Sequence, residues 1–226
     1  MRWYISTRAR LGLALLGASL VSIVLFVAHS LHAHTVEYRY LVWNLCLAWT
    51  PLVLVLWLEK ILRQKLWSSW MALFATVLFV IFLPNTFYMI TDLIHLQDIP
   101  QLDIVTDVVM FSSFVFTAFT LGLLSVYMLH KELSRRVKPL SAWLYVAGLL
   151  LATSFAIYIG RDLRWNSWDV IVNPASILFE VSDHVIHPIA HPQVFATTLS
   201  FFVFIGSVYA VTWHAARAVR QQKNSR

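Results

Sequence analysis

Residues 104–129 read "IVTDVVMFSSFVFTAFTLGLLSVYML", an apolar stretch whose only charged side chain is that of Asp107. A helix needs about 20 consecutive apolar residues to cross the hydrocarbon core of a bilayer, and this stretch is long enough to cross it at a tilt. Its apolar residues follow one another without the alternation that a strand of a transmembrane β-barrel shows. The stretch therefore predicts a membrane-spanning helix.

Apolar stretches of similar character lie on either side of it. The 226-residue chain is 59% hydrophobic and 12% charged, with a mean hydropathy of +0.71, whereas a soluble domain of this size exposes more charge. We predict an all-α fold, a polytopic membrane helical bundle that forms one integral membrane domain over residues 1–226, with an interfacial segment between helices 5 and 6. The transmembrane helices, about six in number, are expected at about residues 11–28, 40–58, 67–83, 104–129, 140–159 and 194–213.

The positive charges alternate between the connecting segments and so predict an orientation. Of the 17 Lys and Arg residues, 14 lie in the two termini and in segments 59–66 and 130–139, and three lie in segments 29–39 and 160–193. The positive-inside rule then places both termini in the cytoplasm of a cell whose inner (plasma) membrane holds the protein. The same distribution accounts for the net charge of +6, and no basic segment is long enough to form a nucleic-acid-binding domain.

The remaining polarity gathers near the predicted outer face. Most of the acidic residues and seven of the nine histidines lie there, and the middle of the membrane is nearly free of ionisable groups. Ionisable groups inside a membrane usually mark an ion or proton pathway, so their scarcity argues against a proton-driven pump. The outer face is therefore where we expect a functional site.

The stretch "FLPNTFYMITDLIHL", residues 82–96, supplies the first candidate residues. Pro84 is expected to end the third helix, and Asn85 suits a turn or cap beyond it. If residues 91–95 are helical, Asp92 and His95 share a face at a spacing of three. The carboxylate would then orient the imidazole for acid–base catalysis or behind a metal ion, or the two would only form a local hydrogen bond.

The stretch "GRDLRWNSWDV", residues 160–170, supplies the second set. Arg161 and Arg164 present two guanidinium groups suited to bind phosphate, carboxylate or pyrophosphate. Asn166 and Asp169 would lie beside them. The alternative to anion binding is a purely structural role, in which nearby aspartates neutralise the two arginines.

Two polar residues lie about one turn inside predicted spans. Asn44 is expected either to line the outer pocket or to bridge two helices through a hydrogen bond. Asp107 is expected to pair with Arg161 or Arg164, which would tie the fourth helix to the segment after the fifth.

Metal and cofactor sites have weaker signals. Glu180, His184 and His187 are separated by four and three residues, so they would share one face of a helix. They are candidates for a zinc site, or they form the solvated polar face of an interfacial helix. The histidines of "HSLHAH", residues 29–34, would add ligands or simply belong to a solvated loop. The sequence identifies no cofactor, because it contains no nucleotide-binding, serine-hydrolase or H-E-x-x-H motif, and no pair of histidines faces across the mid-span to hold haem.

Three stretches together resemble a known family: "YLVWNLCLAWTPL" at residues 40–52, "FLPNTFYMITDLIHL" and "GRDLRWNSWDV". They are similar to the bacterial polytopic membrane proteins grouped as domain-of-unknown-function family 1361, and the resemblance covers roughly residues 38–213. The family pattern has Ala-Pro after the asparagine of the second stretch, where this chain has Thr86 and Phe87. The resemblance implies an integral membrane protein of about six spans and supplies no activity, ligand or catalytic residue.

Three functions fit these observations. The leading hypothesis is binding of an anionic lipid headgroup or amphiphile at the outer leaflet, with or without hydrolysis or transfer. Arg161 and Arg164 would hold the anion, Asp92 and His95 would be the catalytic pair, and further ligand-binding positions are Asn44, Asn85, Asp107, Asn166 and Asp169. The alternatives are a small-solute transporter or channel, lined by hydroxyl residues within the fourth and fifth spans, and a membrane scaffold or assembly factor. The expected partners are the lipid bilayer and an anionic lipid or small molecule, and the sequence does not decide the oligomeric state.

Overall fold

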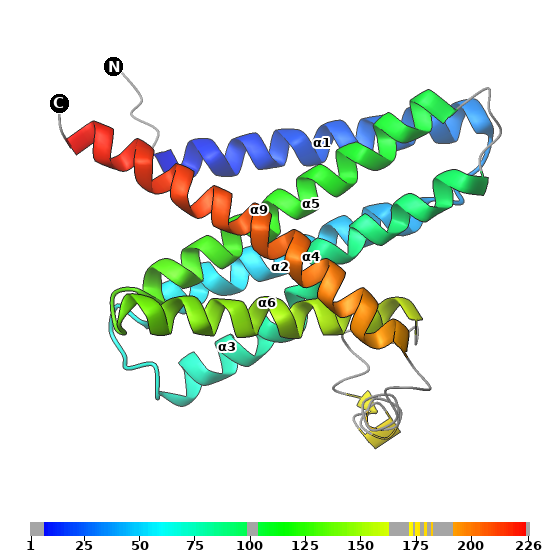
Figure 1. Cartoon of the computed structure of the whole chain (residues 1–226). Helices are drawn as coiled ribbons and strands as arrows, with labels where there is room; N and C mark the ends of the chain where they lie inside the picture. The colour runs from blue at the N-terminus through cyan, green and yellow to red at the C-terminus, as the bar shows by residue number, and fades with distance from the viewer. Residues whose placement is uncertain are drawn as a thin grey trace, which may run out of the picture.

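The computed structural model describes residues 7–98, 104–162 and 192–224, together with single positions between 172 and 182. Its elements are all helical over these residues (Figure 1). In chain order they are α1 (Thr7–Ala33), α2 (Arg39–Ile61), α3 (Trp70–Phe82), α4 (Pro84–Tyr88), the 3₁₀ helix η1 (Met89–Asp98), α5 (Ile104–Leu133), α6 (Pro139–Asp162) and α9 (Pro192–Asn224).

Six helical stretches are long and apolar enough to cross a membrane. They cover Ala9–Ala33, Arg39–Ile61, Trp70–Leu96, Ile104–Leu133, Pro139–Arg161 and Pro192–Val219. The predicted all-α membrane bundle of about six transmembrane helices is thereby confirmed, and the chain is a multi-pass membrane protein. The observed boundaries extend most of the predicted spans by a few residues, and only the third differs in kind.

The third crossing continues past the point where the sequence predicted its end. α3 has 13 residues, about 20 Å of helix, which is too short for a hydrocarbon core of about 30 Å. Leu83 keeps right-handed helical angles, with φ −55° and ψ −39°, and Pro84 becomes the first residue of α4. A proline at that position costs little, because its missing N–H has no helical acceptor there. Pro84 therefore interrupts the helix without ending the crossing, which α4 and η1 complete.

A glycine on the neighbouring helix makes room for this interruption. Gly122 lies on α5, which packs against α4. A Cβ atom on Gly122 would lie 2.7 Å from Cζ of Phe87 and even closer to Oγ1 of Thr86. Both of those side chains are fully buried. The contact between α4 and α5 thus depends on the absence of a side chain at position 122.

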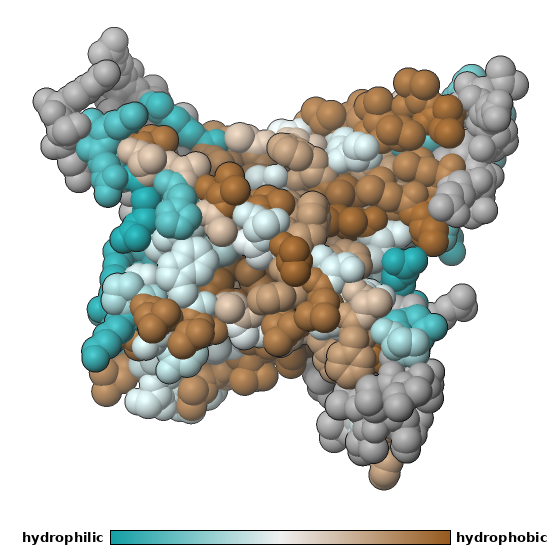
Figure 2. All heavy atoms as spheres, in the orientation of Figure 1, coloured by the Kyte–Doolittle hydropathy of each residue, from teal (hydrophilic) through white to brown (hydrophobic). Residues whose placement is uncertain are grey.

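The helices run back and forth, so the bundle has two distinct ends. We call the termini end the one that holds the first residues of α1, the connections 62–69 and 134–138, and the last residues of α9 (left in Figure 1). We call the distal end the one that holds residues 34–38, the ends of η1 and α6 and the starts of α5 and α9. Hydrophilic residues gather along the termini end, and apolar residues cover the flank of α1 and α5 (Figure 2).

A buried carboxylate organises the termini end. Glu132, 3% exposed near the end of α5, accepts hydrogen bonds from Arg135 and, at 2.6 Å, from Nη1 of Arg136. Arg136 also donates from Nη2 to the carbonyl oxygen of Leu62 at 3.2 Å, and its guanidinium lies 5.7 Å from the ring centroid of Trp67. Glu132 and Arg136 therefore fasten the end of α5 to the connection between α2 and α3.

Candidate functional site

The distal end contains a histidine and a carboxylate that face each other from two helices. Nδ1 of His29, on α1, lies 2.6 Å from Oδ1 of Asp107, on α5, and the two side chains are 10% and 2% exposed. The two atoms form an ion pair when the imidazole is protonated. Asp107 lies in the first turn of α5, where the helix dipole favours a negative charge.

Asp107 was a candidate partner of Arg161 or Arg164, and the structure places it against His29. Arg161 is exposed near the end of α6, and in the described residues no ion pair joins it to Asp107. Arg164 lies outside the described residues. The contact of Asp107 with His29 joins α5 to α1, because those two helices pack side by side.

A cavity of about 310 Å³ lies beside this pair. Its lining comes from α1 and α5 and consists of Leu25, Ala28, His29, His32, Ala33, Thr106 and Asp107. Nε2 of His29 is buried and has no hydrogen-bond partner among the residues that the structure describes. Buried polar atoms are nearly always paired, so an unpaired nitrogen beside a cavity is unusual.

A second polar pair joins α2 to η1. Nδ2 of Asn44 donates to Oδ2 of Asp92 at 3.3 Å, and Asp92 is 5% exposed. The hydroxyl oxygen of Tyr40, also on α2, is buried without a partner in the described part of the chain. Of the two roles that the sequence left open for Asn44, the structure shows the hydrogen bond between two elements.

His95 lies one turn of η1 beyond Asp92 but does not bond to it. A 3₁₀ helix has three residues per turn, so the two side chains stand above one another, as their spacing predicted. Asp92 is buried, whereas His95 is exposed and packs edge-on against Tyr40 with their ring centroids 5.7 Å apart. Within residues 7–98 no hydrogen bond joins Asp92 to His95, and the expected local bond between them is replaced by that from Asn44.

Aromatic rings connect the two polar pairs. The ring of Tyr38 lies 5.3 Å from that of His29 and 6.3 Å from that of Tyr40, and Tyr40 in turn contacts His95. Sequence reasoning did not select Tyr38 or Tyr40, and it noted His29 only within a histidine-containing loop. The available signal was weak, because tyrosines beside an apolar run are also typical of a membrane interface.

The other predicted site residues fall into two groups. Asn85 lies in α4, away from the distal end, and its Nδ2 donates to the carbonyl oxygen of Phe82 at 3.0 Å, so it caps the interruption in the third crossing. The remaining ones lie outside the described residues, and they are Arg164, Asn166, Asp169, Glu180, His184 and His187. Within the described ranges, no three His, Cys, Asp or Glu side chains are grouped so that they could hold a metal ion.

Hydroxyl residues within the spans were candidates for a polar transport route. The hydroxyls of Ser113, Thr117 and Thr120 on α5 donate to carbonyl oxygens three or four residues earlier in the same helix. Ser154 on α6 does the same. Such bonds satisfy the hydroxyl locally, so these residues do not support a continuous polar path.

The bond between Asn44 and Asp92 should contribute measurably to stability. We expect Asn44→Ala to lower the free energy of unfolding by about 1–2 kcal/mol, because the buried carboxyl group loses a donor. Unfolding in mild detergent, measured for Asn44→Ala, Asp92→Asn and the double variant, isolates the pairwise contribution. Additive losses in the double variant would show that the bond contributes nothing.

Comparison with known proteins gives one match. A family model described as "Protein of unknown function (DUF1361)" matches residues 43–208. The matched region includes Asn44, Asp92 and Asp107, and it begins after His29 and Tyr40. No curated protein matches the chain, and no solved structure matches it.

Proposed function

The chain belongs to the DUF1361 family of proteins of unknown function, and from this premise we propose that it is an inner-membrane protein that binds the anionic head of an amphiphile at the outer leaflet. The observation that carries the proposal is the cavity that His29 and Asp107 line, together with the buried and unpaired Nε2 of His29. The description of the family names no activity, so the proposal rests on the side chains of this chain.

The orientation in this proposal follows from the distribution of positive charge. Fourteen of the 17 Lys and Arg residues lie in the two termini and in segments 59–66 and 130–139, and the described parts of these segments lie at the termini end of the bundle. Cytoplasmic segments are enriched in these residues, so the termini end faces the cytoplasm. The distal end, with the cavity, then opens at the outer leaflet.

His29 and Asp107 together provide a donor for an anionic oxygen. When the imidazole is protonated, Nδ1 neutralises Asp107 and the N–H at Nε2 is a charge-assisted donor. Without this neutralisation the carboxylate would repel an anion. His32 and Thr106 also line the cavity, so they border the space that a small polar head would occupy.

The surface beside the cavity suits the apolar tail of such a molecule. Val24 and Leu31 on α1 are 57% and 71% exposed, and Val105 and Val109 on α5 are 74% and 50% exposed. Figure 2 shows this flank as a continuous apolar surface. A tail would lie along it in the bilayer while the head occupies the cavity.

The contacts of His29 and His95 differ, and on this difference we assign the histidine that would act in any hydrolysis or transfer. A carboxylate that contacts one nitrogen of an imidazole favours general acid–base catalysis at the other nitrogen. Nδ1 of His29 contacts Asp107, whereas His95 is exposed and Asp92 bonds to Asn44. We therefore transfer the proposed acid–base role from Asp92 and His95 to His29 and Asp107.

The proposal predicts that His29→Ala weakens binding of an anionic amphiphile by at least about tenfold, because a hydrogen bond to a charged group contributes about 1.5–3 kcal/mol. Dodecyl phosphate, titrated into protein held in a neutral maltoside detergent and followed by native mass spectrometry, is a suitable probe. His95→Ala is the matched control, since His95 lies at the same end but does not line the cavity. We expect His95→Ala to bind as the unmodified protein does.

Two results would contradict the proposal. Loss of binding in His95→Ala with full binding in His29→Ala would restore the assignment to Asp92 and His95. A variant with alanine at both Arg161 and Arg164 is expected to bind more weakly, since cations near a membrane surface attract anionic heads. Unchanged binding in that double variant would show that the two arginines do not belong to the site. Unchanged binding in both the double variant and His29→Ala would contradict the proposal and favour the hypothesis of a membrane scaffold.

A further inference from the structure

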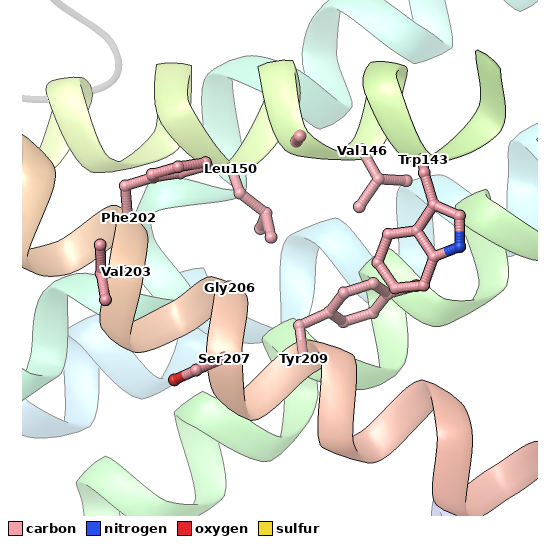
Figure 3. Close-up of a pocket in the computed structure, with 9 residues that line it drawn as sticks. Trp143, Val146, Leu150, Phe202, Val203, Gly206, Ser207 and Tyr209 are labelled. Atoms are coloured by element: carbon pink, nitrogen blue, oxygen red, sulfur yellow. The ribbon is translucent and has the colours of Figure 1, made fainter. Parts of the chain in front are cut away.

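A groove with a volume of about 270 Å³ lies between α6 and α9, toward the termini end and separate from the His29 cavity. Trp143, Val146 and Leu150 line it from α6, and Phe202, Gly206 and Tyr209 line it from α9 (Figure 3). Both helices are membrane-spanning, so lipid surrounds the groove. Gly206 has no atoms of a neighbour near the place of its missing Cβ, which leaves this part of the groove open.

Almost all of the surface that lines the groove is apolar. The hydroxyl of Tyr209 is engaged with Nδ1 of His130 at 2.8 Å, so Tyr209 offers only its ring. The hydroxyl of Ser207 donates to the carbonyl oxygen of Phe204. His130 itself is 1% exposed and stacks on Trp213 with ring centroids 3.7 Å apart. The lining therefore suits hydrocarbon.

The dimensions of the groove suit a single hydrocarbon chain. The lining residues on α9 run from Phe202 to Tyr209, which is about 10 Å of helix. A volume of 270 Å³ over that length corresponds to a mean cross-section of roughly 26 Å².

Cationic and imidazole side chains lie beyond the mouth of the groove. Arg217 follows Tyr209 by two turns, about 12 Å, and its guanidinium lies 5.4 Å from the ring centroid of Trp213. The ring of His214 lies nearly parallel to that of Trp143 with their centroids 6.1 Å apart. Arg217 and His214 are both exposed. They therefore lie where a phospholipid in the groove would place its phosphate.

We propose that this groove binds an acyl chain of an anionic phospholipid from the leaflet at the termini end, with Arg217 contacting the phosphate. An arginine suits this role because its planar guanidinium can form two hydrogen bonds with a phosphate. The groove and the His29 cavity lie at different ends of the bundle, so this site stands independently of the proposed function.

The test is native mass spectrometry of the protein in neutral detergent, supplied with phosphatidylglycerol or with phosphatidylcholine of the same acyl chains. Gly206→Phe should fill the groove and reduce the number of retained phosphatidylglycerol molecules by one. Gly148→Phe is the matched control, because Gly148 is exposed on α6, does not line the groove and also has open space at its Cβ. This control should retain as much lipid as the unmodified protein.

The charge is tested separately from the groove. Arg217→Gln should lower the preference for phosphatidylglycerol over phosphatidylcholine by about fivefold, the effect expected of one cation at an anionic surface. Arg63→Gln, which removes an exposed cation at the same end but away from the groove, should leave that preference unchanged. This variant keeps the groove open, so it remains informative if Gly206→Phe does not fold.

Three outcomes would overturn the proposal. Equal retention by Gly206→Phe and Gly148→Phe would show that the groove does not hold lipid. Equal retention of the two lipids by the unmodified protein would exclude an anionic head. Loss of an oligomer in Gly206→Phe, without loss of lipid, would show that a second copy of the chain covers the groove.

Discussion

Replacing Gly122 by leucine is expected to lower the free energy of unfolding by about 3 kcal/mol, the upper part of the range for overpacking a filled core. The new Cβ alone would overlap Thr86 and lie 2.7 Å from Cζ of Phe87. Thr86 cannot turn away freely, because its hydroxyl donates to the carbonyl oxygen of Leu83 at 2.7 Å. Relief therefore requires α4 to move away from α5.

The smaller change Gly122→Ala separates this clash from helix propensity. Alanine favours a helix over glycine by about 1 kcal/mol, which offsets part of the overlap, so we expect a smaller net loss than for leucine. Gly148→Ala and Gly148→Leu are the matched controls, since Gly148 lies within α6 and has nothing within 4 Å of its Cβ position. Thermal or denaturant unfolding in detergent measures all four variants. Equal stability of Gly122→Leu and Gly148→Leu would mean that α4 does not pack closely on α5.

Replacing Glu132 by leucine is the second change with a large expected effect, a loss of about 2 kcal/mol. Removing one partner of a fully buried ion pair costs about 3–5 kcal/mol, because the other charge is left without compensation. The cost is lower here, since the side chains of Arg135 and Arg136 are 56% and 32% exposed and regain water. The connection between α2 and α3 should loosen as well, because Arg136 also binds the carbonyl oxygen of Leu62.

Glu132→Gln keeps the shape of the side chain and removes only its charge. We expect it to lose about half as much stability as Glu132→Leu, since the amide oxygen still accepts a hydrogen bond from an arginine. Glu37→Gln is the control, because Glu37 is exposed at the distal end. Hydrogen exchange of residues 62–69 should rise in both Glu132 variants and stay unchanged in Glu37→Gln. Protection that is equal in all three proteins would show that Glu132 does not organise this end.

The fold could be predicted from the sequence because a bilayer imposes one length on every crossing. The stretch at residues 104–129 illustrates this, since its apolar length alone gave the core of α5. The end of the third crossing could not be predicted in the same way. Proline ends a helix in most contexts. The third crossing continues past Pro84 because Leu83 keeps helical angles and Gly122 leaves space for α4. That contact joins positions far apart in the chain.

The candidate site could be predicted only in part, for a related reason. Hydropathy placed Asn44, Asp92 and Asp107 near one end of the bundle, and the structure finds all three at the distal end. It could not choose the partner of Asp107, because that choice depends on which helix packs against α5. An arginine was the natural candidate by charge, whereas the neighbour is α1, which brings His29.

The order of the partners along the chain has a consequence for how the protein is made. His29 precedes Asp107, and Asn44 precedes Asp92, so in both pairs the partner of the carboxyl group is synthesised first. N-terminal segments leave the ribosome earlier, and an unpaired carboxylate is among the costliest groups to insert into a bilayer. Each acidic residue therefore reaches the membrane when α1 and α2 already offer its partner. A nascent chain stalled after α2 would hold both partners and neither carboxylate.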